Sequence, residues 1–224
     1  VGINDDITNL SVPYDKTFTI PNKNIEFLIY GFGSDGMVSA AKDLMKVTGT
    51  YTNAYVQGYF QYDSKKSGGV TISHLRFAKK PVKSTYYVEK ASLIVCTKES
   101  YLKKLKMLDK IKENGVFVVN SNKKPDDLLL SMTIHDKKII QSRNIKMYVV
   151  DADKIAKECG IPGKISAIME ALIFKLGKII DLDFAIGKIK ENLAVKFANK
   201  SGNLVEKNVK AIEMCLDALV PVKL

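Results

Sequence analysis

The residues of this chain best suited to chemistry lie in two glycine-rich segments of its first third. The first segment, residues 31–36, reads Gly-Phe-Gly-Ser-Asp-Gly and has the spacing G-x-G-x-x-G. Glycines at this spacing permit a tight turn and let the backbone approach a phosphate, which then sits at the N-terminus of the following helix. Gly33, Ser34, Asp35 and Gly36 are therefore candidate anion-binding residues.

The second segment, residues 63–69, reads Asp-Ser-Lys-Lys-Ser-Gly-Gly. Paired lysines, serine hydroxyls and glycine amides offer positive charge and hydrogen-bond donors to an oxyanion. The lysines precede the glycines and no G-K-[ST] follows, which argues against a nucleoside-triphosphatase loop. A solvated hairpin tip is the alternative. The candidate ligand residues of this segment are Ser64, Lys65, Lys66, Ser67, Gly68 and Gly69.

Two other interpretations of the first segment remain open. A nicotinamide or flavin dinucleotide site calls for an acidic residue about twenty positions later, at the end of the second strand. Residues 51–58, Tyr-Thr-Asn-Ala-Tyr-Val-Gln-Gly, contain none, which disfavours a dinucleotide. The glycines could instead serve only a sharp turn and close helix packing.

Strand and helix patterns surround both segments. An apolar strand is expected at 25–30, and apolar positions on one helical face follow the first glycine segment at 37–47. A second strand is expected at 54–60, a polar loop at 61–69 and an alternating strand at 70–77. The order strand, glycine turn, helix is the usual opening of a phosphate-binding α/β unit.

The remainder of the chain continues this α/β pattern and then becomes helical. Short apolar runs predict buried parallel strands at 93–96, 116–120 and 147–150, with helical spacing at 100–113 between the first two. After residue 151 strand patterns end, and helices are expected at 152–159, 164–179, 182–198 and 204–219.

These patterns predict two regions. Residues 1–24 are polar and are expected to form an extended lead-in arm, and residues 25–224 a single α/β domain. The expected fold is a Rossmann-like open, mostly parallel sheet with helices on both faces and a helical C-terminal third. The chain begins at Val1, and we expect it to be a part of a longer protein. It has no run of about eighteen uncharged apolar residues, so no membrane span is expected.

The charge balance points to an anionic partner. Lys and Arg number 35 against 24 Asp and Glu, for a net charge of +11. Nucleic acid is one candidate, because lysines neutralise phosphates. The only arginines, however, are Arg76 and Arg143, and arginine is the usual side chain for bidentate base recognition. The lysines are also scattered, which is typical of a solvated surface and compatible with a smaller anionic ligand.

Cysteines and histidines are too few and too widely spaced for a metal site. Cys96, Cys159 and Cys215 form no C-x-x-C pattern, which disfavours an iron–sulfur cluster or structural zinc held by this chain alone. An odd, sparse set also argues against a disulfide framework and for a reducing, cytoplasmic location. His74 and His135 have no second histidine at ligand spacing.

Longer blocks around the two segments carry a family resemblance. Besides residues 33–36, these are Gln-Gly-Tyr-Phe at 57–60, the ten residues from Tyr62 to Thr71, and Ser-His-Leu-Arg-Phe at 73–77. Together they resemble the γ module of pyruvate:ferredoxin (flavodoxin) oxidoreductase, the third domain of the single-chain enzymes, and the resemblance extends over nearly the whole chain.

The first segment departs from the usual pattern of that family immediately after its last glycine. The family has threonine, glycine and asparagine where this chain has Met37, Ser39 and Ala41. These positions begin the helix expected at 37–47, so the departure concerns the helix start at which a phosphate would lie.

The resemblance implies a larger electron-transport enzyme that cleaves pyruvate or another 2-oxoacid on thiamine diphosphate. Electrons would pass through [4Fe-4S] clusters to ferredoxin or flavodoxin, and the acyl group to coenzyme A, giving acetyl-CoA from pyruvate. The thiamine and cluster sites would lie in other domains or subunits of the same enzyme, which would be a homodimer. This segment would contain no catalytic residue and would be inactive by itself.

The resemblance also implies a role for the two glycine segments, which is coenzyme A binding by residues 33–36 and 64–69. His74 and Arg76 lie two residues apart, hence on one face of their strand, and either reach the ligand or line a domain contact. Two alternatives for the whole chain are a non-catalytic scaffold domain and a basic nucleotide- or nucleic-acid-binding module.

Overall fold

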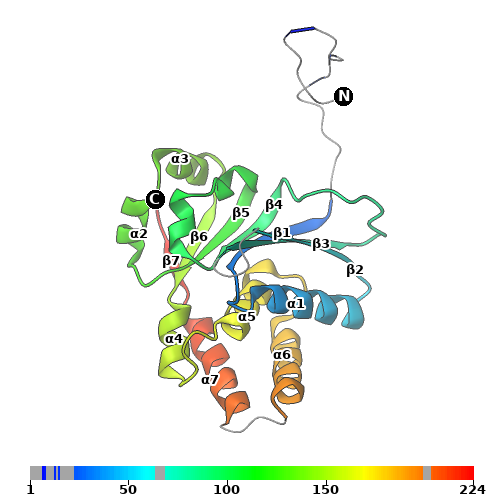
Figure 1. Cartoon of the computed structure of the whole chain (residues 1–224), viewed down its shortest axis with the longest axis vertical. Helices are drawn as coiled ribbons and strands as arrows, with labels where there is room; N and C mark the ends of the chain where they lie inside the picture. The colour runs from blue at the N-terminus through cyan, green and yellow to red at the C-terminus, as the bar shows by residue number, and fades with distance from the viewer. Residues whose placement is uncertain (1–6, 9–12, 14, 16–22, 64–68, 199–202) are drawn as a thin grey trace.

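The computed structural model describes residues 7–8, 13, 15, 23–63, 69–198 and 203–224 (Figure 1). Nearly all of the expected lead-in arm at 1–24 therefore lies outside the described residues. The same holds for residues 64–68, which include both lysines of the second glycine segment.

A seven-stranded sheet forms the centre of the molecule, with the strand order β2-β3-β1-β4-β5-β6-β7 (Figure 1). β1, β4, β5 and β6 pair in parallel. β3 is antiparallel to both β1 and β2, and β7 is antiparallel to β6, so five of the seven strands run in one direction. The expected open, mostly parallel sheet is confirmed. The strands are β1 (Ile25–Phe32), β2 (Tyr55–Tyr62), β3 (Val70–Ala78), β4 (Ala91–Cys96), β5 (Ile111–Asn120), β6 (Lys146–Val150) and β7 (Val220–Val222).

The central strands are buried on both faces, as is usual for parallel sheets covered by helices. In β1, Phe27 and Ile29 pack into one hydrophobic cluster, whereas Leu28 and Tyr30 pack into the other. Successive side chains of a strand point to opposite faces, so one apolar run supplies both cores.

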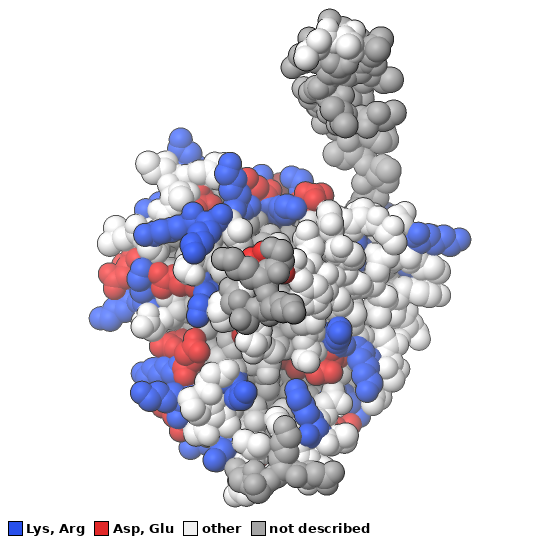
Figure 2. Space-filling model, viewed as in Figure 1, with Lys and Arg blue, Asp and Glu red and all other residues white. Residues whose placement is uncertain are grey.

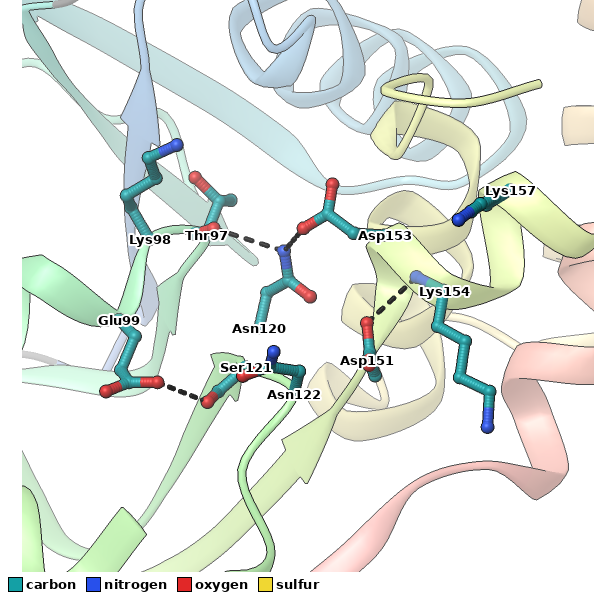
Figure 3. Close-up of a pocket in the computed structure, with 10 residues that line it drawn as sticks. All are labelled: Thr97, Lys98, Glu99, Asn120, Ser121, Asn122, Asp151, Asp153, Lys154 and Lys157. Atoms are coloured by element: carbon teal, nitrogen blue, oxygen red, sulfur yellow. Dashed lines mark hydrogen bonds between the residues drawn. The ribbon is translucent and has the colours of Figure 1, made fainter.

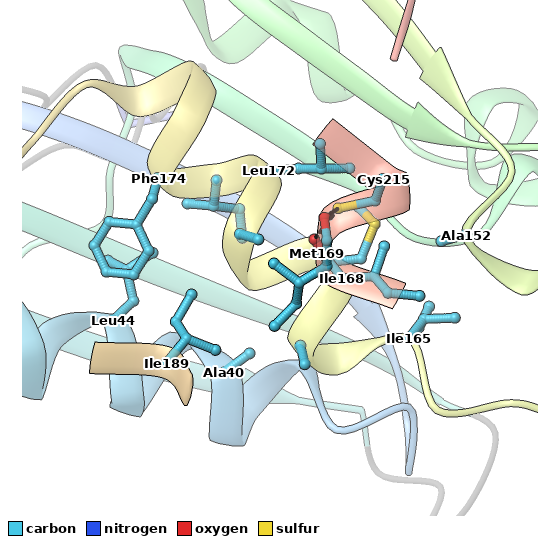
Figure 4. Packing of buried hydrophobic residues seen from close by; sticks show 14 of the residues in the cluster. Ala40, Leu44, Ala152, Ile165, Ile168, Met169, Leu172, Phe174, Ile189 and Cys215 are labelled. Carbon is cyan, nitrogen blue, oxygen red and sulfur yellow. Dashed lines mark hydrogen bonds between the residues drawn. The ribbon is translucent and has the colours of Figure 1, made fainter. Parts of the chain in front are cut away.

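One face of the sheet carries the larger helical layer, in which α5 is buried on all sides (Figure 4). Residues 167–174 of α5 are all buried, as expected for a helix that is hydrophobic all round. Burial, and secondarily the charge of Asp43, raises the pKa of Glu170 in this run to about 8, so its carboxyl is mainly neutral at pH 7. The layer comprises α1 (Met37–Tyr51), α4 (Ala152–Glu158), α5 (Ser166–Gly177), α6 (Leu182–Phe197) and α7 (Leu204–Asp217).

The opposite face is covered by shorter elements: the 3₁₀ helices η1 (Glu99–Lys103) and η2 (Met107–Lys110), and the helices α2 (Pro125–Ser131) and α3 (Ile134–Ser142). Helices therefore cover both faces, as predicted. No helix in the described part of the chain is long and apolar enough to cross a bilayer.

Two sequence-based expectations about elements were wrong. Residues 100–113 form η1, η2 and the start of β5 rather than one helix. Their leucines recur at 102, 105 and 108, a period of three that suits 3₁₀ turns better than the 3.6 of an α-helix. Strand structure also does not end at residue 151, because β7 follows α7 and forms one edge of the sheet. β7 has three residues, and its Pro221 is tolerated because β7 is an edge strand.

Candidate functional site

The two glycine segments meet at the carboxyl end of β1. The Gly33 N–H donates to the Gly69 carbonyl oxygen at 2.8 Å. Beside this bond lies a hollow of about 320 Å³, hereafter the glycine-turn hollow. It is lined by the turn after β1, the first residues of α1 and the adjoining ends of β2 and β3: Phe32, Gly33, Ser34, Asp35, Gly36, Met37, Val38, Ser39, Tyr62, Asp63, Gly69, Val70 and Thr71. Of the predicted ligand residues, the structure brings Gly33–Gly36 and Gly69 together, while residues 64–68 lie outside its description.

The Asp35 carboxylate holds the glycine turn in shape. It accepts hydrogen bonds from the backbone N–H of Phe32 at 2.7 Å and of Met37 at 2.9 Å. It also accepts one from the hydroxyl of Thr97, at the end of the neighbouring strand β4, at 2.8 Å. Asp35 thus joins the turn, the helix start and the next strand, so its carboxylate shapes the hollow from within the protein.

Backbone conformation explains the glycine at position 36. Gly36 has a φ of +82°, and a Cβ there would lie 3.0 Å from the Cβ of Ser166 at the start of α5. The turn therefore packs directly on the C-terminal helical layer. Ser34 also has a positive φ, +78°, which is uncommon for a residue other than glycine.

The start of α1 offers hydrogen-bond donors to the hollow. The first amides of a helix have no partner within the helix and carry partial positive charge. Asp35 takes the Met37 N–H, and the next two residues, Val38 and Ser39, line the hollow. No acidic residue stands in the first turn of α1. Amides in this position can bind a phosphate or another oxyanion, although Asp35 and Asp63 also line the hollow.

The two other predicted site residues, His74 and Arg76, are buried in β3. Arg76 is 1% exposed, and its Nε donates to Glu26 Oε1 at 2.8 Å. Its Nη1 donates to Gln57 Oε1 at 3.0 Å, and its guanidinium carbon lies 3.8 Å from the ring centre of Tyr86. These contacts all lie within the chain itself.

The buried surroundings of β3 also keep the His74 ring neutral. The Val88 N–H donates to its Nδ1 at 3.0 Å, which assigns the proton to Nε2, 2.9 Å from Gln61 Oε1. Burial, together with the nearby charges of Lys110 and Arg76, lowers the pKa of His74 to about 4. Its side chain therefore acts as an uncharged bridge between β2, β3 and the segment that precedes β4.

A second hollow, of about 460 Å³, lies at the carboxyl ends of β4, β5 and β6 (Figure 3). Its centre is Asn120, whose Nδ2 donates to the Thr97 carbonyl at 3.2 Å and to Asp153 Oδ2 at 2.8 Å. Asn120 Oδ1 accepts from the Ala152 N–H at 2.9 Å. This strand-end hollow is lined by Thr97, Lys98, Glu99, Asn120, Ser121, Asn122, Asp151, Asp153, Lys154 and Lys157.

The strand-end hollow was not predicted from the sequence, although a signal for it exists. Thr97 and Asp151 directly follow the buried runs of β4 and β6, and Asn120 closes that of β5. The carboxyl ends of parallel strands meet at one edge of a sheet, where ligands of open α/β folds bind. The polar residues at these three strand ends could have identified this edge of the sheet as a candidate ligand site.

Charges on the visible face of the molecule are mixed. Figure 2 shows lysine and arginine side chains interspersed with acidic ones over that face. The pattern agrees with the expectation that most lysines form a solvated surface.

The residues present do not fit an iron–sulfur cluster. Cys96, Cys159 and Cys215 are free and buried, and they lie in or beside β4, α4 and α7 respectively. Burial raises the pKa of both Cys96 and Cys215 to about 12, so both remain thiols at neutral pH. Among the described residues no three His, Cys, Asp or Glu side chains are grouped to hold a metal ion.

Comparisons with known proteins identify relatives over nearly the whole length of this chain. Pyruvate-flavodoxin oxidoreductase of Trichormus variabilis is 39% identical over 220 residues, which are 98% of this chain and 18% of that protein. Pyruvate:ferredoxin oxidoreductase of Moorella thermoacetica is 39% identical over 224 residues, 100% of this chain and 19% of that protein. Pyruvate dehydrogenase [NADP(+)] of Cryptosporidium parvum is 38% identical over 225 residues, 99% and 12% respectively. The chain thus spans less than a fifth of the length of these relatives.

Solved structures share the fold at lower identity. Subunit PORC of pyruvate oxidoreductase from Thermotoga maritima has a TM-score of 0.70 at 19% identity and covers 90% of this chain and 100% of that one. A 2-oxoglutarate:ferredoxin oxidoreductase from Magnetococcus marinus has a TM-score of 0.66 at 16% identity, covering 88% and 31%. The family described as pyruvate ferredoxin/flavodoxin oxidoreductase matches residues 26–218. Together with the identity to full-length relatives, this match shows that the chain belongs to the pyruvate ferredoxin/flavodoxin oxidoreductase family.

Proposed function

We propose that residues 25–224 form a γ-type domain that binds coenzyme A for a thiamine-dependent pyruvate (2-oxoacid):ferredoxin or flavodoxin oxidoreductase. The observation that carries the proposal is the glycine-turn hollow, where the two glycine segments meet beside the start of α1. Such a hollow suits a diphosphate, because backbone amides and a helix N-terminus approach it together.

Each part of the site has a role in this proposal. The Gly33 and Asp35 amides bond within the turn, so the amides of Ser34, Gly36 and Ser67–Gly69 cradle phosphate oxygens. The Ser64 hydroxyl assists them, and Lys65 and Lys66 supply positive charge. Asp35 positions the turn through its three hydrogen bonds. A charge-assisted contact of this kind is worth about 1.5–3 kcal/mol when desolvated and less when exposed.

Chemistry in the proposed enzyme takes place outside this chain. In the whole enzyme, thiamine diphosphate would supply the chemistry of 2-oxoacid cleavage, and [4Fe-4S] clusters would supply electron transfer to ferredoxin or flavodoxin. In this proposal both belong to other domains or subunits, and the three cysteines of this chain lie in or beside three different elements. This domain binds and orients coenzyme A as the acyl acceptor and contacts those neighbours. The isolated chain is inactive in this proposal.

The names of the relatives support a role that does not depend on the electron acceptor. The three relatives described above are named for flavodoxin, ferredoxin and NADP(+), yet they are 39%, 39% and 38% identical to this chain. A domain that chose the acceptor would be expected to differ more among them. Coenzyme A binding is a step that enzymes with different acceptors can share.

Calorimetric titration of the chain with coenzyme A tests this proposal. Lys65→Ala/Lys66→Ala removes two charges and should weaken binding by about tenfold or more. Lys79→Ala/Lys80→Ala is a matched control, because it removes the same charge from exposed positions directly after β3, at the opposite edge of the sheet. Equal affinity of wild type and Lys65→Ala/Lys66→Ala would contradict the lysine assignment. Absence of coenzyme A binding by the wild type would contradict the proposed function for this chain and favour a scaffold role.

A further inference from the structure

The acidic side chains of the strand-end hollow are occupied by contacts within the protein. Glu99 Oε2 accepts from the Ser121 hydroxyl at 2.5 Å, and Glu99 Oε1 lies 2.6 Å from Lys123 Nζ. Asp151 Oδ1 accepts from the Lys154 N–H at 2.8 Å, and Asp153 accepts from Asn120. Burial acts to raise the pKa of Glu99, but the contacts with Lys123 and Ser121 outweigh it and lower that pKa. These three carboxylates, those of Glu99, Asp151 and Asp153, therefore help to hold the walls of the hollow in place.

The lysines of the same hollow are differently placed. Lys98, Lys154 and Lys157 line it and are exposed. Within the described part of the chain, no carboxylate lies within 4.0 Å of the Lys98 or Lys157 ammonium, and Lys154 has only Glu158 at 3.9 Å. Lys98 lies two residues after β4 and Lys157 lies in α4, and the two flank Asn120 from opposite sides in Figure 3. Because Lys123 pairs with Glu99, the remaining lining carries three lysines against two aspartates.

The strand-end hollow shares a wall with the glycine-turn hollow. Thr97 lines the former and donates its hydroxyl to Asp35, which lines the latter, at 2.8 Å. Lys98 Nζ lies 4.6 Å from the ring centre of Phe32, another residue of the glycine-turn hollow. The two hollows therefore lie side by side along one edge of the sheet.

We propose that the strand-end hollow is a phosphate-monoester site in which Lys98 and Lys157 bind the phosphate. This inference rests on the proposed function, because the source we assign is the ribose 3′-phosphate of the coenzyme A whose diphosphate lies at the glycine turn. A monoester carries close to two negative charges at neutral pH and suits two ammonium groups on opposite sides. A free phosphate would present the same chemistry, and the test distinguishes the two sources.

The experiment compares coenzyme A with 3′-dephospho-coenzyme A in calorimetric titrations of the full chain. Wild type should bind coenzyme A about tenfold more tightly than the dephospho form. Lys98→Ala/Lys157→Ala should remove that preference while changing the affinity for the dephospho form by less than about twofold. Lys79→Ala/Lys80→Ala, with the same loss of charge, should keep the preference. All four lysines are exposed, so the variants should fold.

The outcomes separate this inference from the proposed function. If Lys98→Ala/Lys157→Ala keeps the preference of the wild type, the phosphate site is wrong although coenzyme A binds. If the wild type binds neither ligand, the proposed function fails, and inorganic phosphate becomes the probe in an NMR titration. Shifts of the Thr97, Asn120 and Lys157 amides that vanish in Lys98→Ala/Lys157→Ala would then support a site for free phosphate, and no shifts would overturn it.

Discussion

The glycine turn and the polar face of β3 contrast in environment, although both are rich in residues that can bind ligands. At the turn, Ser34 is exposed, and the start of α1 borders a hollow. On β3, His74 and Arg76 are 2% and 1% exposed and bond to other side chains of the same domain. Residue type and spacing alone do not distinguish a binding site from a buried polar network; burial and hydrogen-bond partners do.

The contrast has an energetic consequence. A buried charge or imidazole with well-placed partners contributes to the free energy of unfolding, because removing one partner leaves the other desolvated and unpaired. An open turn contributes less to stability, because water can replace lost contacts. Substitutions on β3 should therefore lower stability with little effect on coenzyme A affinity. Substitutions at the turn should lower affinity clearly and cost less stability than those on β3.

Arg76→Met should have the largest effect. Among the described residues, it leaves the side chain of Glu26, 3% exposed, with Lys112 at 3.6 Å as its one cationic partner. It should lower the free energy of unfolding by about 3–5 kcal/mol. Urea denaturation measures the change, and Glu26→Gln/Arg76→Met should recover part of the loss because no carboxylate remains unpaired. A loss below about 1 kcal/mol, or a tenfold change in the coenzyme A affinity of the folded variant, would contradict the distinction between the buried face of β3 and the glycine turn.

The pH dependence of stability should come next in size. Folding lowers the pKa of His74 to about 4, from an ordinary 6.5. The folded state thus favours the neutral ring, so this contribution is complete above about pH 6.5 and is lost as the pH falls towards 4. The loss should be on the order of 2–3 kcal/mol.

Urea denaturation of wild type and His74→Asn between pH 7 and 4.5 measures this contribution. The asparagine oxygen can still accept from the Val88 N–H, which now bonds His74 Nδ1, but the side chain cannot titrate. The wild type should lose more stability than His74→Asn on acidification. An NMR titration in which the His74 ring protonates near pH 6.5 would contradict a buried neutral histidine.

Asp35→Ala should have the smallest effect on stability and a clear effect on binding. It removes the acceptor of three hydrogen bonds at a half-buried position and should cost about 1–2 kcal/mol of unfolding free energy. Coenzyme A should bind about tenfold more weakly, because the turn amides lose their orientation. Asp35→Asn keeps one acceptor oxygen and should fall between wild type and Asp35→Ala. Unchanged affinity in both variants would show that the turn serves helix packing and does not bind coenzyme A.

Much of the architecture was predictable because its patterns are local. The helical stripe expected at 164–179 is α5 at Ser166–Gly177, and the apolar run at 147–150 is β6. Errors occurred where tertiary contacts outweigh local pattern. Residues 100–113 bury their apolar side chains in two 3₁₀ turns and a strand, and Val220–Val222 becomes a strand only because the edge of β6 is available.

The sequence by itself determined the strand–turn–helix unit and the candidate anion-binding residues, because the residue spacing that specifies a tight turn and a helical face is a local property. Tertiary structure decided what those residues adjoin. The antiparallel register that places Phe32 opposite Val70 brings Gly33 to Gly69, and pairing of β1 with β4 brings Thr97 to Asp35. The register of the sheet likewise decided that Arg76 would face Glu26. Strand pairing is set by the shared core on both faces, and a single segment of sequence does not contain that information.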